Sequence, residues 1–147
     1  MTQEEKELLL KDLCTRLDTN LVCSIYRTDD EGVGYRDEIL HGYCKGDIWY
    51  EFYFRKDCSI SIDSVSKIKP YLFPLSSITE GQKDQISQLL LDAKIEYTPY
   101  EEDYNHLLVS SVKQANALIN YCLANHLDIN GLIEKGLAID ATGLNIY

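Results

Sequence analysis

Cysteine and histidine are the side chains of this sequence that could support metal or nucleophilic chemistry. His41 and Cys44 are three residues apart, and Cys23 and Cys58 lie in apolar segments that are typical of strands. Zinc needs several thiolate or imidazole groups that converge on one ion, but residues three apart in a strand point to opposite faces of a sheet. The spacing therefore favours buried thiols, and the sequence predicts no metal and no cofactor.

A cysteine nucleophile would need a histidine partner that the fold brings close, and His41, His106 and His126 are the candidates. No local motif marks such a pair. The five cysteines are odd in number and widely scattered, which is typical of reduced thiols rather than a disulfide framework. An enzyme whose site joins a cysteine to His41 or His106 from distant parts of the chain is therefore an alternative hypothesis, and the sequence leans against it.

Carboxylates and glycines give no stronger catalytic signal. Glu101, Glu102 and Asp103 are adjacent, which is more typical of a solvated charge run than of a general acid paired with a general base. The glycines of GVG at residues 32–34 lack the further spacing and the lysine of a phosphate-binding loop. We therefore expect no phosphate cradle.

Tyrosines and acids alternate in the segment after residue 95, which is the best candidate for binding another protein. Tyrosine supplies contact area at a low cost in entropy, and acidic neighbours would steer a basic surface towards it. The competing interpretation is that these tyrosines only cover an edge of the core. The predicted partner-binding residues are Tyr97, Tyr100, Glu101, Glu102, Asp103 and Tyr104.

The first half of the chain has the pattern of one helix followed by strands. Thr2 and Glu5 have the spacing of a capping box, and leucines recur every three or four residues to about residue 18. Beyond Asn20 the apolar period becomes two, which predicts strands. We expect strands at 21–27, 38–44, 48–54 and 58–63, a loop at 28–34 and a turn at 45–47.

The stretch KPYLFPLSSIT, residues 69–79, separates the strands from a more helical second half. Pro70 and Pro74 each lack an N–H and restrict the residue before them, so the stretch is predicted to be a rigid extended or single-turn connector rather than one continuous regular element. Its apolar side chains are expected to be buried. Beyond it, the periodicity predicts helices to about residue 94, at 111–125 and at 129–135, with a short strand at 106–110.

These elements predict one α+β domain over residues 1–147. At 45% hydrophobic content the chain can bury a real core. The predicted sheet is an antiparallel meander of about four strands, packed on one face by three to four helices and by the connector.

The segments KPYLFPLSSIT, residues 69–79, and HLDINGLIEKGLAIDA, residues 126–141, resemble motifs in a group of small proteins of gut-bacterial phages and mobile elements. Phe73 stands where that group has a basic residue, and Ile129-Asn130 stands where it has an aromatic-basic pair. The resemblance implies a phage or mobile-element setting and an intracellular site of action, and it implies no reaction. The matching residues are Lys69, Pro70, Tyr71, Leu72, Pro74, Ser76, Ser77 and Thr79, then Asp128, Gly131, Leu132, Ile133, Glu134, Gly136, Leu137 and Ala138.

The formal charge of −10 limits the possible partners. A phosphate backbone needs a basic face, so direct nucleic-acid binding is not expected. No apolar run approaches the roughly 20 residues that span a bilayer, and the acidic start is unlike a signal peptide, so we expect a cytoplasmic protein without membrane contact. The leading hypothesis is a small non-enzymatic accessory protein that binds a host or phage protein with a basic surface. An acidic mimic of DNA is a further alternative.

Overall fold

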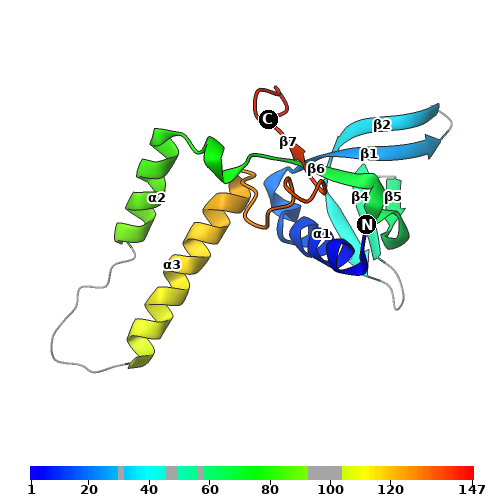
Figure 1. The fold of residues 1–147 in the computed structure, drawn as a ribbon. Helices are drawn as coiled ribbons and strands as arrows, with labels where there is room; N and C mark the ends of the chain where they lie inside the picture. Colours follow the sequence, from blue (N-terminus) through cyan, green and yellow to red (C-terminus); the bar gives the residue numbers. More distant parts are fainter. Residues whose placement is uncertain (30–31, 46–49, 56–57, 93–103) are drawn as a thin grey trace.

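The computed structural model describes residues 1–29, 32–45, 50–55, 58–92 and 104–147. Figure 1 shows a body of strands with one helix against it, and a pair of helices that extends to one side. The elements in chain order are α1 (Gln3–Thr15), β1 (Val22–Asp29), β2 (Gly32–Ile39), β3 (Gly42–Lys45), β4 (Tyr50–Arg55), β5 (Cys58–Ser61), β6 (Ile68–Leu72), α2 (Glu80–Asp92), α3 (Tyr104–Ala124) and β7 (Ile139–Asp140), with short 3₁₀ helices η1 (Leu17–Thr19), η2 (Ile62–Lys67) and η3 (Leu75–Ser77).

Helix α1 begins with the predicted capping box. The Glu5 N–H donates to the Thr2 hydroxyl at 3.2 Å, and the Thr2 N–H donates to the Glu5 carboxylate at 2.6 Å. Two otherwise unpaired donors of the first turn are thereby satisfied. The helix ends at Thr15 rather than near residue 18, and Asn20 takes a left-handed conformation with φ of 54°. Asparagine tolerates that conformation better than most residues.

The predicted loop at 28–34 is wrong, because most of it belongs to a long hairpin. β1 and β2 pair antiparallel from Val22 opposite Ile39 to Asp29 opposite Gly32. The rings of Tyr26 and Tyr35 make an edge-to-face contact across the pair, 5.1 Å between centroids, and such cross-strand aromatic pairs stabilise a hairpin. The acids and glycines that predicted a loop therefore mark only the end of a hairpin.

The chain passes from one sheet to the next between two consecutive residues. The Leu40 N–H donates to the Leu21 carbonyl at 2.8 Å, whereas the His41 N–H donates to the Tyr53 carbonyl of β4 at 2.7 Å. The two sheets, ordered β2-β1-β6-β7 and β3-β4-β5, therefore meet at this corner. The pairs among β1 to β6 are antiparallel, as predicted, but the strands form two sheets rather than one meander, because β1 also pairs with β6.

Strand β6 corrects two expectations. Residues 68–72 are extended, as predicted, but they form a paired strand through Pro70, which lies opposite Cys23 of β1, rather than a connector between the sheet and the helices. Proline suits a strand where its missing N–H is not needed, and the partner on the other side, β7, pairs only from Tyr71 onward. The pair of β6 with β7 is parallel, so the sheet is mixed rather than antiparallel.

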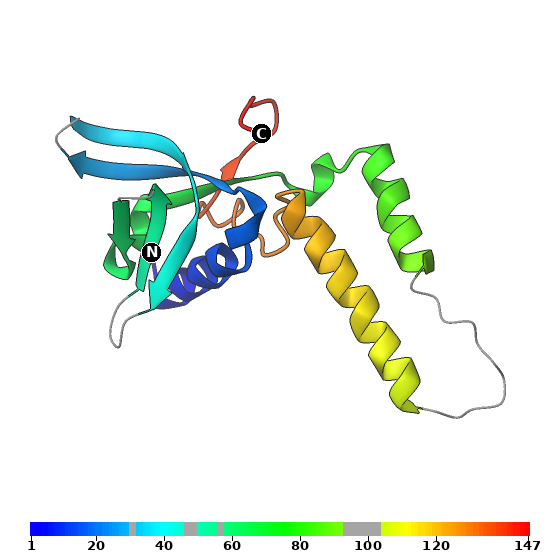
Figure 2. The same ribbon diagram turned by 180° about the vertical axis from the view of Figure 1, so that it is seen from behind.

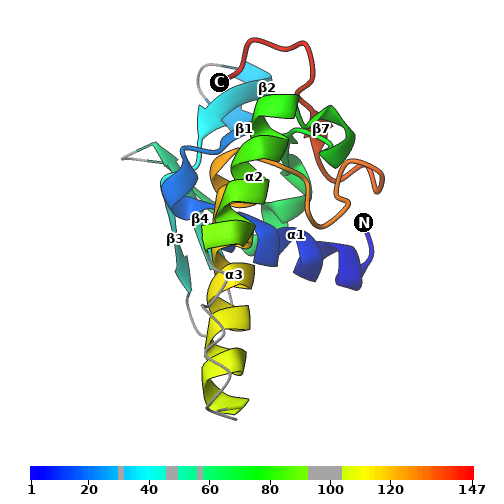
Figure 3. The same ribbon diagram turned by 90° about the vertical axis from the view of Figure 1, so that its left-hand side faces the viewer.

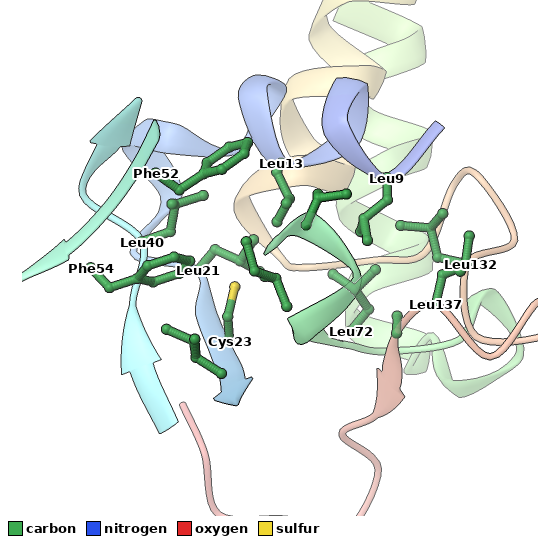
Figure 4. Close-up of a cluster of buried hydrophobic side chains, with 14 residues drawn as sticks. Leu9, Leu13, Leu21, Cys23, Leu40, Phe52, Phe54, Leu72, Leu132 and Leu137 are labelled. Atoms are coloured by element: carbon green, nitrogen blue, oxygen red, sulfur yellow. The ribbon is translucent and has the colours of Figure 1, made fainter. Parts of the chain in front are cut away.

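The core lies between α1, the corner of the sheets and the last part of the chain. Leu9 and Leu13 of α1 point toward β1, β4 and β6, and Leu132 and Leu137 close the far side (Figure 4). Tyr71 and Leu72 are buried, as the sequence predicts for the connector, and Phe73 is half-buried. Leu75 was also expected to be buried, but it lies in η3 beyond the end of β6 and is 49% exposed. The fully buried apolar side chains at its centre are Leu9, Leu13, Leu21, Cys23, Ile25, Phe52, Val65, Ile68, Leu72 and Leu132.

Helices α2 and α3 do not cover the sheet as predicted. They lie side by side and extend away from the strands, so α1 is the helix that packs on the body (Figures 1 and 2). The predicted strand at 106–110 is wrong, because α3 runs through it. Residues 129–135 form turns rather than a helix: the Asp128 carboxylate accepts from the Leu132 and Ile133 N–H groups, and Gly131 has φ of 66°. The sequence spacing could not distinguish these turns from a helix.

We expect Leu72→Ala to lower the free energy of unfolding by about 2–5 kcal/mol, since it leaves a cavity among fully packed neighbours. Leu75→Ala is the matched control, because Leu75 is 49% exposed only three residues further on. That control should change the free energy by no more than about 0.5 kcal/mol. Urea unfolding of both variants measures the difference, and equal losses would contradict the described burial.

Candidate functional site

The two motifs singled out in the sequence meet where the helical pair leaves the body. The Phe73 N–H donates to the His126 carbonyl at 2.9 Å, and the Asp128 N–H donates to the Phe73 carbonyl at 2.8 Å. Phe73 and Leu127 thus form a parallel bridge beside the β6–β7 pair. We call Phe73 and residues 126–128 the joint, and α2 with α3 the arm. The chain leaves and re-enters the body at one point.

A fully buried arginine holds the joint from the side of α1. Arg16, with 0% of its side chain exposed, donates through Nε to Asp12 Oδ2 at 2.8 Å and through Nη2 to Asp12 Oδ1 at 3.2 Å. Nη2 also donates to the Leu127 carbonyl at 2.8 Å. Asn130 Nδ2 donates to Asp12 Oδ1 at 2.7 Å. A buried charge is tolerated only when it is paired in this way.

His126 occupies the joint in an unusual state. It has φ of 54°, is almost fully buried and stacks on the Tyr147 ring, 3.9 Å between centroids and 10° between planes. Burial, and then the positive charge of Arg16, lowers its pKa to about 4. The imidazole is therefore neutral at pH 7. Tyr147 donates its hydroxyl to the Tyr71 carbonyl at 2.6 Å, which holds the stacked ring in place.

The two helices of the arm contact each other through polar and half-buried apolar groups. The Tyr121 hydroxyl donates to Gln85 Oε1 at 2.7 Å, and Gln114 Nε2 donates to the Leu90 carbonyl at 3.4 Å. Ile86 and Leu89 of α2 are only half-buried. In Figure 3, which views the arm from its outer side, α2 lies in front of α3, and the two helices contact each other along this seam. The arm therefore buries little apolar surface by itself.

The other side of α3 is apolar and faces solvent. Val112 is 49% exposed and Ile119 is 44% exposed, and Ala115 between them is also exposed. Lys113 is the only Lys, Arg, Asp or Glu in the 21 residues of α3. A helix that faces water normally carries charges on that face. We call Val112, Ala115 and Ile119 the outer stripe.

The predicted partner-binding segment joins the two helices of the arm along the chain. Tyr97, Tyr100, Glu101, Glu102 and Asp103 lie outside the described residues, so their role stays a prediction. Tyr104 is the first residue of α3. The sequence pattern also placed Val112 and Ile119 on an apolar helix face, but we expected that face to cover the sheet.

The thiols that the structure describes do not have the character of nucleophiles. Burial raises the pKa of Cys14, Cys23 and Cys122, which is opposite to the lowering that activates a thiolate. Cys44 and Cys58 belong to β3 and β5. His41 is exposed at the corner of the sheets, and His106 belongs to α3. In the described part of the chain no three Cys, His, Asp or Glu residues gather as metal ligands would.

The buried Asp12–Arg16 pair was missed by the sequence analysis. Its signal was present as an acid and an arginine four residues apart, between Leu9, Leu13 and Leu17 on one face of a helix.

None of the helices in the described ranges is both long and apolar enough to cross a membrane.

Replacing Arg16 by methionine should lower the free energy of unfolding by about 3–5 kcal/mol, because the Asp12 carboxylate would be left buried without its cation. Adding Asp12→Leu to Arg16→Met should recover a large part of that loss, since no buried charge then remains. Denaturant unfolding of the single and double variants measures both effects. A single variant as stable as the original chain would refute the role of the pair.

The low pKa of His126 predicts a specific pH dependence. Its pKa of about 4 in the folded chain lies below the ordinary value of 6.5, so the unfolded chain binds more protons between these values. Stability should therefore fall as the pH is lowered from about 6.5 toward 4. His126→Asn, which suits a positive φ, should flatten this slope, whereas His41→Asn at an exposed position should keep it. Thermal unfolding at several pH values gives the slopes, and equal slopes would count against this account.

No family model, curated protein or solved structure matches this chain. Its function is therefore inferred from the joint, the arm and the segment that links the arm helices.

Proposed function

We propose that this chain is a small accessory protein that binds another protein through the segment from Tyr97 to Tyr104. The observation that carries the proposal is the direction of the arm. α2 and α3 run outward from the body, and α2 ends and α3 begins at their outer ends (Figures 1 and 2). The predicted segment lies between these two ends in the sequence. The arm adds no strand to the sheets and does not cover them, and a role in contacting another protein would explain its presence.

The composition of the segment supports a partner with a basic surface. Residues 93–103 contain four acids, Glu96, Glu101, Glu102 and Asp103, against Lys94. A cluster of negative side chains attracts a basic protein and speeds its association. Tyrosine rings beside them can accept arginine or lysine through cation–π contacts and supply apolar area. The partner is therefore a protein that exposes arginine or lysine around an apolar centre.

The alternatives gain no supporting observation in the described residues. A cysteine enzyme would need a thiol with a lowered pKa, and the described thiols shift the other way. A DNA mimic would need acids at regular intervals along an exposed element. α3 is the longest helix in the described residues, and its 21 residues contain no acid. The non-enzymatic binding protein is therefore the proposal that fits best.

The resemblance to proteins of gut-bacterial phages and mobile elements stays part of this proposal. Its two motifs are the segments that form and flank the joint, through the Phe73–Leu127 bridge and the β6–β7 pair. A chain that shares both motifs is then expected to share the joint, and to hold an arm by it. The likeness thus bears on how the arm is held rather than on what it contacts.

Affinity capture from a bacterial host lysate tests the proposed contact. The original chain and Tyr35→Ala should recover the same protein, because Tyr35 is an exposed tyrosine of β2 in the body. Tyr100→Ala should reduce the recovery at least about tenfold, as expected for an aromatic anchor. Recovery should also weaken steeply with salt, because screening shortens the reach of the acids to about 8 Å at physiological ionic strength.

Recovery of the same proteins by the original chain and by Tyr100→Ala would rule out the segment as the contact. A partner lost with Tyr35→Ala instead would move the contact to the body.

A further inference from the structure

Helix α3 carries apolar residues on two sides, and α2 covers one of them. Ala117, Leu118 and Tyr121 are half-buried on the side that faces α2. The outer stripe, Val112, Ala115 and Ile119, recurs at intervals of three and four residues and lies on the opposite side. Following the same side toward the body leads to Leu123, which is buried. The outer stripe therefore continues the interior of the protein out along the arm.

We propose that a second copy of this chain covers the outer stripe, so that the two α3 helices pack against each other and each α2 lies on the outer side of its own α3. Two helices bury one seam, and a second apolar side on α3 needs a further helix to cover it. The outer stripe of another copy offers the same residues in the same order, as a two-fold contact requires. Ala115 between two β-branched side chains lets the two α3 helices approach closely.

The charge distribution favours a second copy over an oppositely charged partner at this surface. The arm carries −1 of the total −10, and its outer stripe is uncharged. Two arms can therefore meet without bringing the acidic bodies together. Antiparallel arms also place the two outer ends, where α2 ends at Asp92 and α3 begins at Tyr104, at opposite ends of the contact. The charged residues of the arm are Glu80, Lys83, Asp84, Asp92 and Lys113.

The dimer would add to the proposed function without depending on it. A dimer contains two copies of the segment from Tyr97 to Tyr104. A partner with repeated basic surfaces would then bind both segments, and the second contact would be formed within the complex at a high effective concentration. The outer stripe and the binding segment would have separate tasks.

Sedimentation and light scattering test the dimer. The original chain should have a mass twice 16.9 kDa, with a concentration-dependent return to 16.9 kDa. Val112→Glu with Ile119→Glu should raise the dissociation constant at least about tenfold, because two carboxylates would have to be buried in the contact. Val33→Glu is the control, since Val33 is a valine 67% exposed on β2 and should leave the dimer intact.

Two further variants keep the test independent of folding. Val112→Ser with Ile119→Ser adds no charge and should weaken the dimer in the same direction, with helix content unchanged by circular dichroism. Mixing the double glutamate variant with Val112→Lys plus Ile119→Lys should restore a dimer from two monomers, because opposite charges then meet across the two copies. The restored dimer is expected whether the two arms lie parallel or antiparallel.

An original chain that stays monomeric at every concentration would overturn the proposal, as would a dimer that survives the double glutamate substitution. Loss of the dimer with Val33→Glu would place the contact on β2 instead. These failures are distinguishable from failure of the proposed function. Tyr100→Ala should keep the dimer while losing the captured partner, and a monomeric chain could still capture that partner through its segment.

Discussion

The structure depends on a guanidinium group that has no access to water. Arginine stays charged at any ordinary pH, so Arg16 must find acceptors inside the protein. Asp12 supplies a carboxylate from the preceding turn of α1, and the Leu127 carbonyl supplies a neutral acceptor from a segment more than a hundred residues away. That requirement fixes where the chain returns after α3. It also fixes Asn130, which shares Asp12, and so aligns the turns that bring Leu132 and Leu137 into the core.

With the return fixed, most of the body forms without the arm. The main buried cluster draws on α1, the strands, η2 and the turns near the end of the chain, and among the described residues of the arm only Cys122 and Leu123, at the inner end of α3, are buried. The arm is attached through the joint and through its own seam, where Ile86 and Leu89 are half-buried. Such a unit contributes little to the stability of the body and opens at a lower free energy than the core. Its sequence is therefore constrained by what it contacts.

Local features of the fold could be predicted from the sequence, and the long-range ones could not. The capping box of α1, the antiparallel strands and the burial of Tyr71 and Leu72 each follow from spacing within a few residues. The parallel pairing of β6 with β7 and the bridge of Phe73 to Leu127 join segments more than fifty residues apart, and no local pattern encodes them. The same holds for the candidate site: the Asp12–Arg16 spacing was visible, but its acceptor at Leu127 was not.

The outer stripe shows why an apolar helix face is ambiguous. Its period establishes that Val112 and Ile119 share one side of α3, and the transfer of such side chains from water is favourable wherever they go. It does not identify the surface that covers them. We assumed the sheet, because a single chain normally covers its own helices. Because the joint directs α3 away from the body, the sheet cannot cover the outer stripe. The favourable free energy of burying these side chains can then come only from contact with another molecule. An exposed stripe on a nearly uncharged helix is thus what a helix looks like when its covering surface belongs to another molecule.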